Sequence, residues 1–97
     1  MPCAYVIADV EVSDPGQYGR YTALSPGAIA AAGGEFIVRG GRPEVLEGDW
    51  SPSRVVVVRF DTLAAARAFY DSALYVAARA ERAGATTTFN MIIVEGV

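Results

Sequence analysis

The stretch Ser53-Arg54-Val55-Val56-Val57-Val58-Arg59-Phe60 contains four consecutive valines and decides the class of fold. β-Branched residues favour strands. An apolar run without alternating polar residues is typical of a strand that is buried on both faces. We therefore predict a strand over residues 53–60, in the centre of a sheet.

Three other segments also predict strands, because they are rich in β-branched residues and lack a helical period. They are Ala4–Val12, Glu35–Arg39 and Thr86–Val97. Gly40 and Gly41 interrupt the chain after the second of these segments. We expect a glycine bulge there, followed by a short edge segment over residues 44–48 and a loop.

A first helix is predicted from Pro15 to about Ala32. Ser13 or Asp14 supplies its capping oxygen, and apolar residues recur along it at spacings of three and four. Pro26 lies inside this segment. Proline removes a backbone hydrogen bond and clashes with the preceding turn, so we expect a kink or two helical pieces.

A second helix is predicted after Asp61-Thr62, which offers a capping side chain. Its apolar stripe runs on through Tyr75, Ala78 and Arg82 towards Gly84. Asp71-Ser72 reads as a joint at which the helix restarts.

The predicted order βαββαβ is that of the ferredoxin-like α+β fold, in which two helices cover one face of a four-stranded antiparallel sheet. The other face would then be bare. It would carry β-branched side chains, which proteins in water rarely leave exposed. We therefore predict that a second copy of the chain covers this face and forms a homodimer.

Composition limits the class of protein. The 97 residues fit one domain, over residues 1–97, and 53% of them are hydrophobic. A net charge of −3 gives no general attraction for phosphates, so we predict no nucleic-acid partner. The longest apolar runs are far too short to cross a membrane, the start does not resemble a secretion signal, and a single cysteine suits a reducing compartment. These features predict a cytoplasmic protein without a membrane partner.

The available chemistry is also limited. The chain has no histidine and no lysine, which removes the commonest general base, metal ligand and Schiff-base amine. Cys3 is the only cysteine and has no histidine to activate it, so we expect it to be inert. Catalysis would have to use Asp, Glu, Tyr, Arg, Cys3 or a bound cofactor, and the sequence itself predicts no metal site and no cofactor.

Several strings of residues resemble a bacterial family known as domain of unknown function 1330. They are Arg39-Gly40-Gly41, Val45-Leu46-Glu47-Gly48, Phe69-Tyr70-Asp71-Ser72 and Val94-Glu95-Gly96. The resemblance spans residues 5–96 and implies a dimeric α/β barrel built from ferredoxin-like subunits. It implies no established reaction, although similar dimeric barrels include cofactor-independent oxygenases, lactone isomerases and haem-degrading enzymes.

Three tyrosines are candidates for contact with a ligand. Tyr21, Tyr70 and Tyr75 lie on the predicted helices and can project their rings towards the sheet, where such folds open pockets. Buried aromatic rings are also ordinary core residues with a hydroxyl at the edge. Both interpretations stay open from the sequence.

Arg39 and Glu47 complete the set of candidate ligand-binding residues. Arg39 stands at the glycine break, where its guanidinium could hold a carboxylate or an enolate oxygen through two hydrogen bonds. The alternative is that Arg39 pairs with Glu47 and stabilises the bend.

Other charged and aromatic residues allow two interpretations each. Arg59 is expected to pair with Glu95 or Asp9 across the sheet or the dimer interface, although one of these carboxylates could instead act as a general base. Arg82 belongs either to a solvated helix face or to the rim of an anion pocket. Trp50 is expected to act as a lid or to anchor an interface.

These observations favour a homodimeric protein that binds a small molecule between its helices and its sheet. One alternative is a cofactor-independent oxygenase or isomerase that acts on a small activated organic acid or phenol with the help of a carboxylate base. Another is a structural or regulatory module that only associates with itself or with another protein.

Overall fold

Four strands form one antiparallel sheet. The computed structural model describes residues 2–97, and its strands are β1 (Ala4–Val12), β2 (Glu35–Gly41), β3 (Arg54–Phe60) and β4 (Thr86–Glu95). Their order in the sheet is β2-β3-β1-β4. The valine-rich strand β3 is therefore an interior strand, as predicted, and β2 and β4 are the edges.

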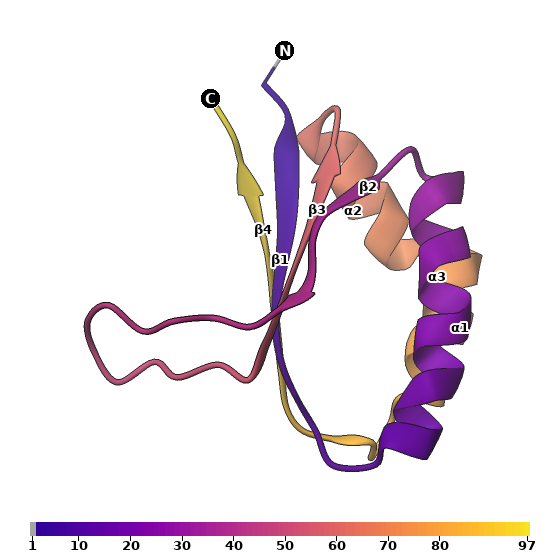
Figure 1. Cartoon of the computed structure of the whole chain (residues 1–97). Coiled ribbons are helices and arrows are strands. Elements are labelled where there is room, and N and C mark those ends of the chain that lie inside the picture. The colour runs from indigo at the N-terminus through magenta and orange to yellow at the C-terminus, as the bar shows by residue number, and fades with distance from the viewer. Residues whose placement is uncertain (1) are drawn as a thin grey trace.

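Three helices cover one side of this sheet (Figure 1). They are α1 (Pro15–Ala31), α2 (Leu63–Asp71) and α3 (Ala73–Glu81). The order along the chain is β1-α1-β2-β3-α2-α3-β4, which differs from the predicted βαββαβ order by one additional helix. Within residues 2–97, none of the helices is long and apolar enough to cross a membrane.

The extra helix arises at Ser72, where a joint was predicted. Ser72 has extended backbone angles (φ −64°, ψ 149°), which end α2. Its hydroxyl donates to the carbonyl oxygen of Phe69 at 2.7 Å, and its Oγ accepts from the backbone N–H of Tyr75 at 3.2 Å. One serine therefore ends α2 and caps the start of α3.

Helix α1 is a single helix, so of the two predicted alternatives, a kink or two helical pieces, the second is wrong. Asp14 caps it by accepting a hydrogen bond from the backbone N–H of Gln17 at 3.1 Å, and Pro26 lies inside it. Ala28 and Ile29, after the proline, are buried like the residues before it. Packing of this continuous face on the sheet outweighs the loss of one helical hydrogen bond at Pro26.

Two irregularities interrupt the pairing of β2 with β3. One falls between Phe36 and Val38, and the other between Arg39 and Gly41. The second is the predicted glycine bulge, with Gly40 at a φ of +72° that residues with a Cβ rarely adopt.

The predicted edge segment over residues 44–48 is absent from the sheet, because residues 42–53 form a loop. Pro43 has no N–H to donate to a strand ladder, and β2 already pairs with β3 as far as Val55. Figure 1 shows this loop extending from the sheet on the side opposite the helices.

The helices pack against one face of the sheet and leave the other face without a helix. Val6 and Val10 of β1 point into the core beneath the helices, with Phe60, Phe69 and Tyr75 among the most buried side chains. Side chains at alternate positions point to the other face, where Ile7 lies between Val57 of β3 and Ile92 of β4. No helix among residues 2–97 covers this second face (Figure 1), and Ile92 is 57% exposed. It is the bare β-branched face that the sequence predicted, and we call it the helix-free face.

Candidate functional site

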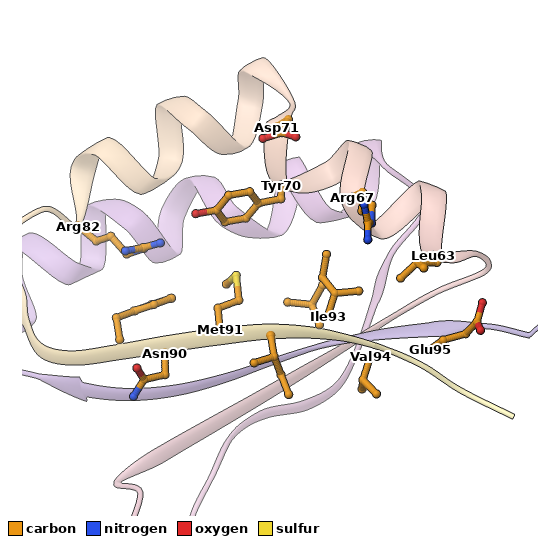
Figure 2. Close-up of a pocket in the computed structure, with 13 residues that line it drawn as sticks. Leu63, Arg67, Tyr70, Asp71, Arg82, Asn90, Met91, Ile93, Val94 and Glu95 are labelled. Atoms are coloured by element: carbon orange, nitrogen blue, oxygen red, sulfur yellow. The ribbon is translucent and has the colours of Figure 1, made fainter.

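A groove of about 950 Å³ runs between α2, α3 and the edge strand β4 (Figure 2). Leu63, Met91 and Ile93 give it an apolar lining. Figure 2 shows Tyr70 above Met91, with Arg82 towards one end of the groove and Arg67 towards the other.

The register of the sheet explains which side chains reach the groove. Met91 pairs with Ala8 and Ile93 pairs with Val6, and both partners are core residues beneath the helices. The intervening Ile92 and Val94 therefore point to the helix-free face. Strand β4 thus points alternate side chains under the helices and to the helix-free face, and the groove continues over the free edge of the strand, where Asn90, Ile92 and Val94 also line it.

Arg82 gives the groove its electrostatic character. It is half-buried just after α3, and its guanidinium carbon lies 3.6 Å from the ring centroid of Phe89 and 5.2 Å from that of Tyr21. Its Nε is buried without a hydrogen-bond partner, and within residues 2–97 no carboxylate oxygen lies within 4.0 Å of its side-chain nitrogens. A partly desolvated cation without a counterion favours the binding of an anion.

Tyr21 and Tyr75 form a buried hydroxyl pair behind Arg82. Their oxygens are 2.7 Å apart, and the Tyr75 ring packs 4.3 Å from the ring of Phe69. Burial, reinforced by the adjacent Tyr75, raises the pKa of Tyr21 well above its usual value, and Arg82 opposes this effect only in part. Tyr21 is therefore protonated at neutral pH and acts as a hydrogen-bonding group rather than as a base.

Replacing Tyr75 by phenylalanine is expected to lower the free energy of unfolding by about 1–3 kcal/mol, because the Tyr21 hydroxyl then loses its buried partner. The double variant Tyr21→Phe/Tyr75→Phe removes both hydroxyls and should recover most of that loss. Urea denaturation of the two variants measures the difference. Equal losses would show that the hydroxyl pair contributes no coupling energy.

Tyr70, one of the candidate ligand-binding residues, lies at the groove. Its ring is 5.8 Å from that of Tyr75, and the guanidinium carbon of Arg79 is 4.1 Å from its ring centroid. Its 38% exposure leaves one part of the ring open to the groove.

Arg39 and Tyr21 line a different and smaller pocket, of about 60 Å³, beneath α1. The guanidinium carbon of Arg39 lies 4.5 Å from the ring centroid of Phe36. Glu47 is exposed in the loop and lines neither cavity. The five predicted ligand-binding residues therefore do not form one site. Tyr70 lies at the groove, and Tyr21 and Arg39 lie at the small pocket. Tyr75 lies between the two cavities, in contact with both Tyr21 and Tyr70, and Glu47 lies in the loop, at neither cavity.

The structure also corrects the predicted ion pairs. Among residues 2–97, Arg39 and Glu47 do not pair. Arg59 pairs with Asp61 at 3.1 Å and with Glu35 at 3.7 Å, rather than with Glu95 or Asp9. Glu95 pairs in register with the core residue Ala4 and so points to the helix side of the sheet, whereas Arg59 points to the helix-free face.

The predicted carboxylate bases are poorly placed for catalysis in the groove. Asp9 lies on the helix-free face, where it accepts a hydrogen bond from Nε1 of Trp50 at 3.0 Å. Glu95 is exposed at the open end of the groove. In the described part of the chain, no three histidine, cysteine, aspartate or glutamate residues gather in a way that could hold a metal ion.

The sequence left open whether Arg82 is solvated or lies at a pocket, and the structure places it at the groove. It continues the buried stripe of α3 at the helical spacing after Tyr75 and Ala78, both of which are fully buried. A charged residue on the buried side of an amphipathic helix is the signal that distinguishes a pocket cation from a solvated one.

Comparison with known proteins identifies the fold and the family. Among solved structures, a protein of unknown function from Rhodopseudomonas palustris has a TM-score of 0.76 and 18% identity, over 99% of this chain and 83% of that one. A dimeric ferredoxin-like protein of unknown function from Thermobifida fusca has a TM-score of 0.66 and 20% identity, over 97% and 91%.

SnoaB, a cofactor-independent oxygenase from Streptomyces nogalater, has a TM-score of 0.68 and 14% identity, over 97% of this chain and 92% of that one. At these identities the likenesses show a shared ferredoxin-like fold. A search of curated proteins finds none that matches. The model of the family described as domain of unknown function (DUF1330) matches residues 3–97, and the chain therefore belongs to this family.

Proposed function

We propose that the protein is a homodimer that binds a small organic anion with an apolar or aromatic body in the groove between α2, α3 and β4. The observation that carries the proposal is Arg82, a half-buried guanidinium with an unpartnered Nε and no carboxylate within 4.0 Å among residues 2–97. An anionic group of a ligand would satisfy this cation through charge-assisted hydrogen bonds.

The lining of the groove supports an organic ligand rather than an inorganic ion. Its volume of about 950 Å³ suits a small molecule. Met91 and Ile93 form an apolar floor, and Tyr70 offers an aromatic face. Arg67, on the far side of Tyr70 from Arg82, can bind a second polar group of the same ligand (Figure 2).

Titration with salicylate tests this proposal, because salicylate combines an aromatic ring with a carboxylate. We expect the variant Arg82→Gln to weaken binding by about 10- to 100-fold, since a hydrogen bond to a charged group contributes roughly 1.5–3 kcal/mol. Isothermal titration calorimetry measures both affinities, and salicylamide, without the carboxylate, should bind more weakly to the unaltered protein.

Arg20→Gln is the matched control, because it removes the same charge from an exposed residue of α1 that pairs with Glu81 at 3.6 Å. It should change the affinity for salicylate by less than twofold. Equal affinities of Arg82→Gln and Arg20→Gln would overturn the assignment of the groove. So would a failure of the unaltered protein to bind salicylate and other aromatic carboxylates.

The homodimer is proposed on the helix-free face. Ile7, Val57 and Ile92 lie side by side there without cover from any helix. Monomeric proteins rarely leave a contiguous β-branched surface in water. The similar protein from Thermobifida fusca is itself described as dimeric and ferredoxin-like, which supports the same arrangement here.

Binding is better supported than catalysis. The oxygenase alternative is favoured only by the likeness in fold to SnoaB, and a shared fold does not transfer a reaction. Asp9 lies on the opposite face of the sheet, and Glu95 is exposed. A module that only self-associates would not need a groove of this size. The cytoplasmic location stays a prediction from the sequence.

A further inference from the structure

The small pocket beneath α1 is a separate place in the molecule from the groove. It has a volume of about 60 Å³ and lies between α1 and strands β1, β2 and β3. Of the described residues 2–97, only Phe89 lines both cavities. The small pocket is therefore a separate candidate site, independent of the groove and of the function proposed for the groove.

Two arginines line this pocket without a protein counterion. Arg54 is half-buried, its Nε has no hydrogen-bond partner, and Arg39 lies at the same pocket. In the chain from residue 2 to residue 97, neither side chain has a carboxylate oxygen within 4.0 Å. Two like charges beside one cavity repel each other, and an anion between them would relieve this repulsion.

Two hydroxyl groups provide further donors. Ser25 of α1 lines the pocket and is only 6% exposed. Tyr18 also lines it, and burial raises the pKa of the Tyr18 hydroxyl while the adjacent Arg54 opposes that rise. The Tyr18 hydroxyl is therefore protonated at neutral pH and able to donate.

The irregular backbone of β2 brings both arginines to this place. Phe36 pairs with Val58 and Arg39 pairs with Val56, so the extra residue at Ile37 puts Arg39 on the helix side of the sheet. Without the extra residue at Ile37, Arg39 would point to the helix-free face. The second bulge places Gly40 against Arg54, where a Cβ on Gly40 would overlap the guanidinium.

We propose that this pocket binds one small anion of the size of chloride, nitrate or formate. The guanidinium groups of Arg54 and Arg39 hold it, and the hydroxyls of Tyr18 and Ser25 donate to it. Its volume of about 60 Å³, against about 950 Å³ for the groove, suits a small anion rather than the body of a larger organic ligand. The site is thus chemically distinct from the groove.

The line width of the ³⁵Cl resonance in sodium chloride solution tests this proposal, because chloride that exchanges rapidly with a protein site broadens the line. The measurement uses protein carrying Arg82→Gln, so that the cation of the groove does not contribute. We expect excess broadening in proportion to protein concentration, and we expect nitrate to abolish it by competition.

Arg54→Gln added to this protein should reduce the excess broadening by at least half, and Arg39→Gln should do the same. Because Arg39 is exposed, its replacement leaves the fold intact even if the Arg54 variant does not fold. Arg20→Gln, with the same change of charge, should leave the line width unchanged. Absence of excess broadening, or equal broadening with Arg39→Gln and Arg20→Gln, would overturn the assignment.

Discussion

Phe69→Ala is expected to lower the free energy of unfolding by about 3–5 kcal/mol, the usual loss when a buried phenylalanine is truncated. Phe69 is 1% exposed, and its ring lies 4.3 Å from that of Tyr75 and 5.2 Å from that of Phe60. It thus joins α2 to α3 and to the interior strand β3. The cavity left by its removal would lie where these three elements meet, so little of it could be closed by local movement.

Urea denaturation at one fixed protein concentration measures this loss, because the stability of a dimer depends on concentration. Phe36→Ala is the matched control, since Phe36 is only half-buried and lies on the edge strand β2. It removes the same side chain and should cause a clearly smaller loss. Similar losses for the two variants would mean that Phe69 does not hold the core together.

The sheet and the joint between the helices could be predicted from the sequence because their signals are local. The β-branched residues of Ala4–Val12 predicted a strand with the bounds that β1 has in the structure. The four valines predicted an interior strand, and β3 is one. Ser72 marked the joint because a serine in extended conformation can end one helix and cap the next.

The prediction failed where the structure of a segment depends on pairing with residues far away in the sequence. Residues 44–48 contain the apolar pair Val45-Leu46, which favours a strand, but they lie in the loop over residues 42–53 and pair with none of the described strands. Trp50 donates a hydrogen bond to Asp9, and its role as a lid or an interface anchor stays a prediction. Propensity describes a segment alone, whereas a strand requires a partner.

The candidate site was predictable only in part. The candidate tyrosines were recognised from their positions on the predicted helices. Which of the two cavities each candidate residue lines, however, depends on the direction of its side chain. Arg39 reaches the helix side because of an extra residue at Ile37, which has no glycine or proline to reveal it. Arg54 sits at the start of the valine strand, and only the register with Val10 shows that it points beneath the helices.

Val57→Asp is expected to convert the proposed dimer into a monomer. Val57 lies on the interior strand β3 and pairs with Ile7, which in turn pairs with Ile92, so it is near the middle of the helix-free face. Burying an unpaired carboxylate costs several kcal/mol, and a two-fold interface would bury two of them. Analytical ultracentrifugation should then give a mass of 10.2 kDa in place of twice that value.

Val76→Asp makes the same change on α3, where Val76 is 44% exposed, and should leave the dimer intact. A monomeric unaltered protein, or a dimer that survives Val57→Asp, would contradict the proposed interface.

The same pair of variants also tests the groove. The side chain of Met91 points into the groove, and that of its neighbour Ile92 points to the helix-free face. Separation of the two copies therefore exposes the helix-free side of β4, the strand that forms the floor of the groove. Salicylate affinity should therefore fall in Val57→Asp and stay unchanged in Val76→Asp, because an exposed edge strand holds its side chains less rigidly than one packed against a second copy.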